Sequence, residues 1–182
     1  MYSQNIQDKI KIVCKFASKD ETRHHLSHAI YLKEQSGLVA CDGHRLIVFK
    51  ESPIIEKPFN ASVYLKTSAL SYADNNISYP NVKNIMPDLT KYSRESITLI
   101  VPEWLAKLEK HNKPIRLCFS ANQIAITMLE NPLFYLDARL LAPLVGLELK
   151  LSYKLGDDSK NCPVYFISSD KEFEGVIMPI RA

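Results

Sequence analysis

The chain has 182 residues, of which 46% are hydrophobic and 24% charged, and it carries a formal net charge of +3. These are the proportions of an ordinary globular protein, so they argue against a disordered chain, and the charge is too small to indicate a nucleic-acid-binding protein by itself. No apolar run reaches the roughly 18 residues of a membrane span, and the four cysteines form no C-x-x-C pair and follow no apolar leader, which predicts reduced thiols in the cytoplasm.

The first segment, residues 5–18, fits two kinds of secondary structure. A helix would bury one apolar stripe made of Ile6, Ile10, Val13 and Ala17. A strand would instead bury alternate residues, namely Ile10, Ile12, Cys14 and Phe16. Periodicity leaves both alternatives open.

A hairpin is expected next, because strands at 28–32 and 38–50 flank the turn residues 35–37. A further strand is expected at 59–65. A short helix at 67–74, capped by Thr67 or Ser68, follows it. The rest of the first half, residues 75–94, has no sustained period and contains two prolines, which predicts a linker or a covering loop. We therefore expect two domains, 1–87 and 88–182.

The second half has a clearer pattern. A strand at 96–101 precedes a helix that begins at Pro102, ends by His111 and presents Trp104, Leu105 and Leu108 on one apolar face. A second hairpin is expected at 114–120 and 123–128. The remaining predicted elements are a strand at 133–136, a short helix at 139–144, and strands at 148–153, 163–168 and 174–179. The sequence thus predicts an α+β architecture with a weak internal repeat of strand, helix and antiparallel strands.

Four motifs together resemble one family. Val39–Leu46 reads V-A-C-D-G-H-R-L, which is similar to the T-D-G-H-R-L strand in the middle domain of bacterial DNA polymerase III β sliding clamps. Three further segments fall in the family's order: D-E-T-R-H-H-L at Asp20–Leu26, S-Y-P-N-V-K-N-I-M-P at Ser78–Pro87, and V-I-M-P-I-R at Val176–Arg181. The resemblance covers essentially the whole chain and implies a DNA-clamp-like processivity fold of antiparallel sheets with short helices. Residues 1–87 correspond to a trimmed middle domain with its linker, and residues 88–182 to the C-terminal domain.

The resemblance also implies a peptide-docking cleft between those two domains. The matching positions are Leu26, Cys41, Gly43, His44, Arg45, Leu46, Pro80, Asn84, Ile85, Val176, Ile177, Met178, Pro179, Ile180 and Arg181. Aliphatic side chains and methionine suit an apolar peptide cleft, and arginine suits its polar rim. Two positions depart from the family, because Cys41 replaces a common threonine and Asn84 a basic residue. Without the resemblance, Leu46 and Val176–Met178 read as ordinary core residues of strands.

A DNA-facing surface is implied at Lys19, Arg23, His24 and His25, on a loop that carries arginine followed by aromatic residues in the family. Such side chains contact phosphates without reading sequence, and the contacts weaken with salt. A solvated loop with no DNA contact is the alternative reading.

The resemblance implies a non-catalytic protein without a cofactor. Its expected partners are DNA polymerase and clamp-loader subunits, which would dock peptides, and duplex DNA, which it would encircle as a processivity factor. Three copies of two clamp-type domains would be needed to close a ring. The alternative is a clamp-like adaptor or decoy that binds replication proteins without forming a ring. A metal site at His24, His28, Asp42 and His44 is a third, weaker alternative.

Overall fold

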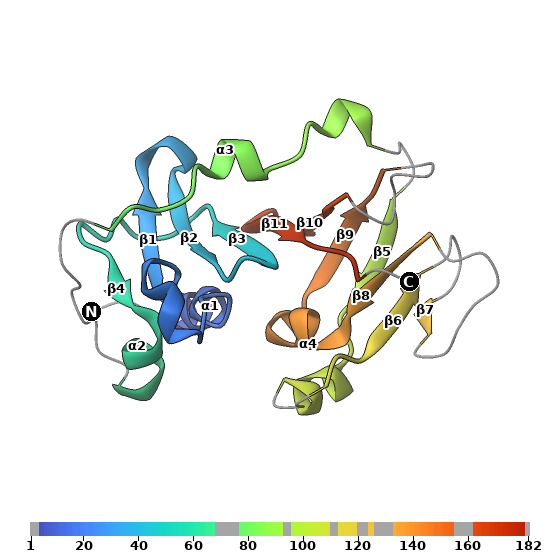
Figure 1. Ribbon diagram of the computed structural model, residues 1–182, viewed down its shortest axis with the longest axis horizontal. Coiled ribbons are helices and arrows are strands. Elements are labelled where there is room, and N and C mark those ends of the chain that lie inside the picture. The colour runs from blue at the N-terminus through green and yellow to red at the C-terminus, as the bar shows by residue number, and fades with distance from the viewer. Residues whose placement is uncertain are drawn as a thin grey trace. The chain divides into compact units, whose positions relative to one another are not determined.

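The structure is a computed structural model that describes residues 4–67, 77–92, 96–109, 113–119, 124–125, 133–154 and 162–180. Its contacts divide the chain into two compact units (Figure 1). The first unit comprises Met1–Ile85 and Asp170–Gly175, and the second comprises Met86–Ser169 and Val176–Ala182. The chain therefore enters the first unit twice. The two units are defined by contacts in space. The division of the sequence into domains 1–87 and 88–182 remains a prediction.

The N-terminal segment is a helix, α1 (Gln4–Cys14). Ile10 and Val13 are fully buried, whereas Ile12 is only half-buried. Burial at a spacing of three residues, rather than two, is the helical pattern. The structure thus decides between the two alternatives left open by the sequence.

The sheet of the first unit has the order β4-β1-β2-β3, with antiparallel neighbours. Its strands are β1 (His28–Leu32), β2 (Gly37–Cys41), β3 (Arg45–Phe49) and β4 (Phe59–Asn60). The short 3-10 helix η2 (Lys33–Gln35) makes the predicted turn between β1 and β2. The helix α1 packs on β2 and β3 (Figure 1). Every residue of the two strands except Arg45 is buried, which agrees with their almost continuous apolar runs.

Two predictions for the first unit are wrong. Residues 38–50 form two strands rather than one, because a turn at Asp42–His44 separates β2 from β3. The strand expected at 59–65 ends at Asn60, where the helix α2 (Ala61–Thr67) begins. The Asn60 side chain accepts a hydrogen bond from the Val63 amide at 3.1 Å, which is how an N-cap residue starts a helix. Most of the helix predicted at 67–74 lies outside the described residues.

The segment Asp170–Gly175 is held in the first unit by contacts with Lys9, Phe49 and Lys50. It contains the first residues of β11 (Phe173–Ile177), and β11 follows β3 in the sheet. The rings of Phe49 and Phe173 are stacked with centroids 5.0 Å apart. The Lys50 amide donates to the Glu172 carbonyl at 2.8 Å, and the Lys9 ammonium pairs with the Glu172 carboxylate. Residues far apart in sequence therefore complete one core.

The predicted linker contains short helices. They are α3 (Val82–Ile85), which belongs to the first unit, and the 3-10 helix η3 (Leu89–Lys91), which belongs to the second. Val82 is fully buried, so this segment is attached to the first unit by packing.

The second unit contains two antiparallel sets of strands. One set has the order β10-β9-β5 and the other the order β7-β6-β8. Their bounds are β5 (Ile97–Ile100), β6 (Arg116–Phe119), β7 (Ile124–Ala125), β8 (Phe134–Asp137), β9 (Glu148–Ser152) and β10 (Val164–Ser168). Phe119, Phe134 and Tyr153 form an aromatic cluster, with ring centroids 4.7 and 5.3 Å apart. The strands predicted for this half are all present, although part of 123–128 lies outside the described residues.

The helices of the second unit are short. The segment predicted as an α-helix from Pro102 is the 3-10 helix η4 (Glu103–Leu108). With three residues per turn, Leu105 shares a face with Leu108 but not with Trp104, which is 42% exposed, so the predicted three-residue face is wrong. The predicted helix at 139–144 is α4 (Ala138–Leu141) followed by η5 (Ala142–Leu144). Strand, helix and strands thus occur twice, confirming the weak repeat and the α+β class.

Within the described residues, every helix is too short or too polar to cross a membrane.

Candidate functional site

The centre of the candidate site is the turn Asp42–Arg45, hereafter the D-G-H-R turn. The Asp42 carboxylate accepts hydrogen bonds from the amides of His44 and Arg45, at 2.9 and 3.0 Å. An aspartate that bonds amides two and three residues later is a common way of fixing a tight turn. The Asp42 amide donates to the Arg45 carbonyl at 3.2 Å. The turn is therefore fixed by its own polar groups.

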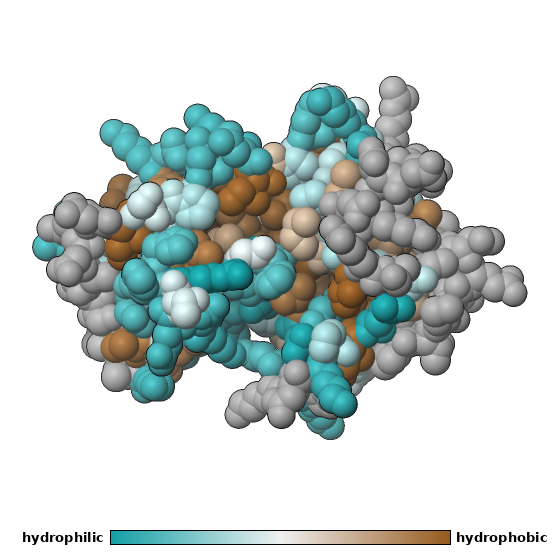
Figure 2. Space-filling model, in the orientation of Figure 1, coloured by the Kyte–Doolittle hydropathy of each residue, from teal (hydrophilic) through white to brown (hydrophobic). Residues whose placement is uncertain are grey.

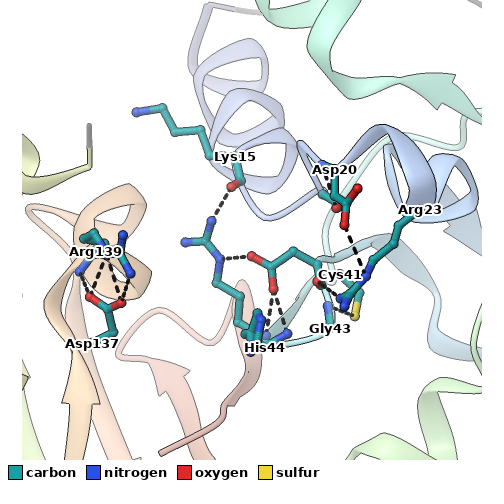
Figure 3. A network of polar contacts seen from close by, with 11 residues as sticks. Lys15, Asp20, Arg23, Cys41, Gly43, His44, Asp137 and Arg139 are labelled. Carbon is teal, nitrogen blue, oxygen red and sulfur yellow. Dashed lines mark hydrogen bonds and ion pairs between the residues drawn. The ribbon is translucent and has the colours of Figure 1, made fainter. Parts of the chain in front are cut away.

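Arg45 is held at one end of this turn. Its Nε donates to the Asp42 carboxylate at 2.9 Å, and its Nη2 donates to the Lys15 carbonyl at 2.7 Å (Figure 3). The guanidinium carbon lies 4.5 Å from the centroid of the Phe16 ring, a cation–π contact. The side chain of Arg45 is 10% exposed. Arg45 thus anchors the turn to the end of α1.

Gly43 has a φ of +90°, which favours glycine over any residue with a side chain. The guanidinium of Arg23 covers its open face. A Cβ at Gly43 would lie 2.6 Å from Arg23 Nη1, and that nitrogen donates to the Asp42 carbonyl at 3.2 Å. Figure 3 shows the Arg23 side chain reaching from its own helix to Gly43 and Cys41. A predicted DNA contact and two predicted peptide contacts therefore meet in the first unit.

Cys41 and Tyr79 lie beside this turn. The Cys41 sulfur accepts a hydrogen bond from the Gly43 amide at 3.4 Å, and burial raises the pKa of its thiol. Burial also raises the pKa of the Tyr79 hydroxyl well above its ordinary value. Both groups are therefore neutral at ordinary pH.

The other predicted peptide contacts of the first unit differ in exposure. Leu26 and Leu46 are core residues, with 6% and 0% of their surface exposed. Pro80 and Ile85 are half-buried, whereas Asn84 is exposed on α3. Gly43 and His44 are exposed on the turn. Leu46 is therefore a core residue, as the strand pattern alone predicts.

The predicted contacts of the second unit form one continuous segment, Val176–Ile180. Val176 and Ile177, the last residues of β11, are buried, and Met178 is 37% exposed. Pro179 and Ile180 are half-buried, and the Ile180 amide donates to the Tyr135 carbonyl at 2.9 Å. Arg181 lies outside the described residues. Which of these residues meet the D-G-H-R turn stays a prediction.

The predicted DNA contacts Lys19, Arg23, His24 and His25 are all exposed. The last three lie on a 3-10 helix, η1 (Glu21–Leu26), rather than on the expected loop. Asp20 caps this helix by accepting from the amide and hydroxyl of Thr22, at 2.9 and 2.7 Å. Those hydrogen bonds hold the pKa of the Asp20 carboxyl below its ordinary value.

Two polar surface cavities flank this capped helix. One, of about 290 Å³, is lined by Lys19 and Arg23 together with Asp42, His44 and Arg45 of the turn. The other, of about 410 Å³, is lined by Lys19 and His24 together with Lys66 of α2. In the space-filling view the surface over α1 is largely hydrophilic (Figure 2). Acidic side chains line both cavities too, so the surface is mixed in charge.

The residues of the metal-site alternative are engaged in other ways. His28 is buried, and its Nδ1 lies 2.8 Å from the His24 carbonyl oxygen. Across the described ranges, no three His, Cys, Asp or Glu side chains come together as a metal site would require.

Sequence reasoning named Asp42 only as a possible metal ligand and gave Lys15 and Phe16 no role in the site, yet all three position the turn and its arginine. A signal for Asp42 exists, because Asp-Gly is a turn dipeptide. Nothing in the sequence pairs residues 15 and 16 with Arg45, since that contact depends on where α1 ends.

Comparison with known proteins identifies the fold. The sequence matches no protein-family model and no curated protein. The DNA polymerase III β subunit from Borrelia burgdorferi, in complex with a natural product, is 16% identical, with a TM-score of 0.64 over 98% of this chain and 61% of that chain. The sliding clamp from Bacillus subtilis is 17% identical, with a TM-score of 0.63 over 98% and 62% of the two chains. The Helicobacter pylori β clamp bound to a DNA ligase peptide is 15% identical, with a TM-score of 0.61 over 99% and 64%.

The chain thus spans less than two thirds of the length of these clamp chains. Sequence identities this low establish the shared fold and nothing finer. Over nearly its whole length, the chain has the fold of DNA polymerase III β sliding clamps.

Proposed function

We propose that this protein is a clamp-like DNA replication protein that docks the clamp-binding peptides of a DNA polymerase or clamp loader. The observation that carries the proposal is the agreement of fold and motif. The chain has the sliding-clamp fold, and its D-G-H-R motif forms a turn fixed by Asp42 with His44 exposed. The Helicobacter pylori clamp with the same fold binds a DNA ligase peptide.

The docking surface proposed here combines polar and apolar parts. The D-G-H-R turn offers the exposed His44 and Gly43, and the C-terminal segment offers Met178. A flexible thioether adapts to varied apolar side chains, which suits a surface that accepts peptides from several partners. We expect a peptide with the pattern Gln-Leu-x-Leu-Phe to bind with micromolar affinity, about −8 kcal/mol.

Calorimetric titration of this peptide tests the proposal. The full chain should bind it, a peptide with the leucines and phenylalanine replaced by alanine should not, and Met178→Glu should weaken binding at least about tenfold. Leu65→Glu is the matched control, because Leu65 is 38% exposed and Met178 is 37% exposed, yet Leu65 is no predicted contact. No heat of binding at millimolar peptide would reject the function.

Encircling DNA is the second part of the proposal. A processivity factor must close a ring around the duplex, which this chain would do as three copies. The alternative is an adaptor or decoy that keeps the peptide surface without the ring. Light scattering of the purified protein decides between them: a particle of three chains supports the ring, and a strict monomer at high concentration supports the adaptor.

A further inference from the structure

One side chain, Arg23, belongs to both proposed surfaces. It is a proposed DNA contact on η1, yet its guanidinium lies over Gly43, a proposed peptide contact. The Arg23 Nη1 donates to the Asp42 carbonyl at 3.2 Å and occupies the space beside the Gly43 Cα (Figure 3). A peptide cannot reach that face of Gly43 while Arg23 covers it.

We propose that Arg23 is a gate that couples DNA binding to peptide docking. It covers Gly43 while the DNA surface is empty, and it uncovers Gly43 when a phosphate draws the guanidinium away. The inference rests on the proposed function, of which it names the regulation.

The contacts of Arg23 are those of a side chain that can exchange partners. Its Nε lies 3.6 Å from the Asp20 carboxylate, and the two side chains are 46% and 49% exposed. Exposed ion pairs of this kind hold a side chain weakly. Arg45 of the D-G-H-R turn is different, because its ion pair is 2.9 Å long and its side chain is 10% exposed. The turn is thus contacted by one fixed arginine, Arg45, and by one exchangeable arginine, Arg23 of η1.

In the proposed gate, Arg23 leaves the Asp42 carbonyl and the Asp20 carboxylate and binds a phosphate of DNA. Guanidinium binds phosphate oxygens through two parallel hydrogen bonds, which a neutral carbonyl oxygen cannot match. Lys19 lines the same cavity and adds a second cation, whereas Asp20 and Asp42 oppose an anion there. The phosphate therefore competes with the Asp20 carboxylate for Arg23.

Peptide binding and DNA binding should strengthen each other, because both ligands favour the same conformer of Arg23. Peptide and phosphate both favour the state in which Arg23 has left Gly43. Two ligands that favour the same conformer raise each other's affinity by the same factor. DNA should therefore strengthen peptide binding, and peptide should strengthen DNA binding.

The experiment titrates the Gln-Leu-x-Leu-Phe peptide into the full chain with and without a saturating short DNA duplex at low salt. We expect DNA to raise the peptide affinity of the wild-type chain about fivefold, at the lower end of usual coupling energies. Arg23→Ala should bind the peptide about fivefold more tightly without DNA and gain nothing when DNA is added. Lys33→Ala is the matched control, since it removes an exposed cation of the first unit that lines neither cavity, and Arg23 still covers Gly43. Its peptide affinity without DNA should equal that of the wild type.

The outcomes separate the gate from the proposed function. If the wild type binds the peptide but DNA leaves its affinity unchanged or lowers it, the gate is wrong and peptide docking stands. If the wild type binds no peptide, the proposed function fails and the gate fails with it. The amide signal of Gly43 in a nuclear magnetic resonance spectrum gives a readout without peptide. It should shift in Arg23→Ala but not in Lys33→Ala, and an unchanged signal in Arg23→Ala would overturn the gate.

Discussion

The D-G-H-R turn and the C-terminal segment Val176–Ile180 are predicted to serve one cleft, but they are built differently. The turn is a set of polar contacts that leaves Gly43 and His44 exposed. The C-terminal segment is apolar, and Val176 and Ile177 are buried. Part of a motif that resembles a binding site is therefore ordinary core, and only substitutions of exposed residues can test binding. The predictions below separate the two kinds of residue.

The largest effect is expected at Leu46, which is fully buried in β3. Leu46→Asp places a charge in the core of the first unit and should reduce the free energy of unfolding by at least about 4 kcal/mol. Urea denaturation followed by circular dichroism measures this. Leu65→Asp, at an exposed position of α2, should change stability by less than about 1 kcal/mol. A stable Leu46→Asp variant that loses only peptide binding would show that Leu46 is a surface contact.

A smaller loss of stability is expected from Phe173→Ala, which removes the ring stacked on Phe49. The cost should be about 3 to 5 kcal/mol, because a large buried side chain is replaced by a small one. Hydrogen exchange resolves where the loss occurs: amides of β3 should exchange faster, and amides of β6 should not. Equal acceleration in both strands would mean that Asp170–Gly175 does not belong specifically to the first unit.

Gly43→Ala should reduce the free energy of unfolding by about 1 to 2 kcal/mol, because a residue with a Cβ is strained at positive φ. Gly146→Ala is a matched control in the second unit, since Gly146 has a φ of +83° and a Cβ there meets no atom within 4 Å. Thermal denaturation should show a similar loss of stability for both variants. Only Gly43→Ala should also displace Arg23 and change peptide affinity. Equal peptide affinity in the two variants would remove Gly43 from the docking surface.

The smallest effect concerns a motif that occurs in both units. Asp20 accepts from the amide and hydroxyl of Thr22, and Asp88 accepts from those of Thr90 in the same way. These hydrogen bonds lower the pKa of both carboxyls, the threonine hydroxyl being the largest cause. A lowered native pKa stabilises the fold above the unfolded pKa, and this contribution disappears as pH falls through the native pKa. Thr22→Val should raise the pKa of Asp20 and leave Asp88 unchanged in a nuclear magnetic resonance titration. A change in the pKa of Asp88 would contradict the claim that each carboxyl pKa is lowered by its own threonine.

Much of the fold follows from the sequence, and the exceptions have local causes. The strands of the second unit are where the pattern predicts them, and β9 alternates buried and exposed residues. Residues 5–18 carry both periods, so periodicity could not identify the helix α1, which packs on α2, β2 and β3. The 3-10 form of η4 rotates Trp104 away from Leu105, which a pattern based on 3.6 residues per turn cannot foresee.

The candidate site was predictable in its residues but not in its contacts. The motifs name Gly43, His44 and Arg45, and the Asp-Gly pair signals a turn. The contact of Arg23 with Gly43 depends on how η1 and the turn are placed by α1 and the sheet, so no local pattern contains it. The strand pattern alone predicted the burial of Leu46, but it also placed Met178 in the core, and the exposure of Met178 is a property of packing.

Chemical-shift mapping of the full chain with the Gln-Leu-x-Leu-Phe peptide tests the central claim most directly, since it reports on both segments at once. The account predicts that amide signals of Gly43 and His44 in the turn and of Met178 and Ile180 in the C-terminal segment move together, while those of η4 stay in place. Movement confined to η4, or no movement at millimolar peptide, would contradict it.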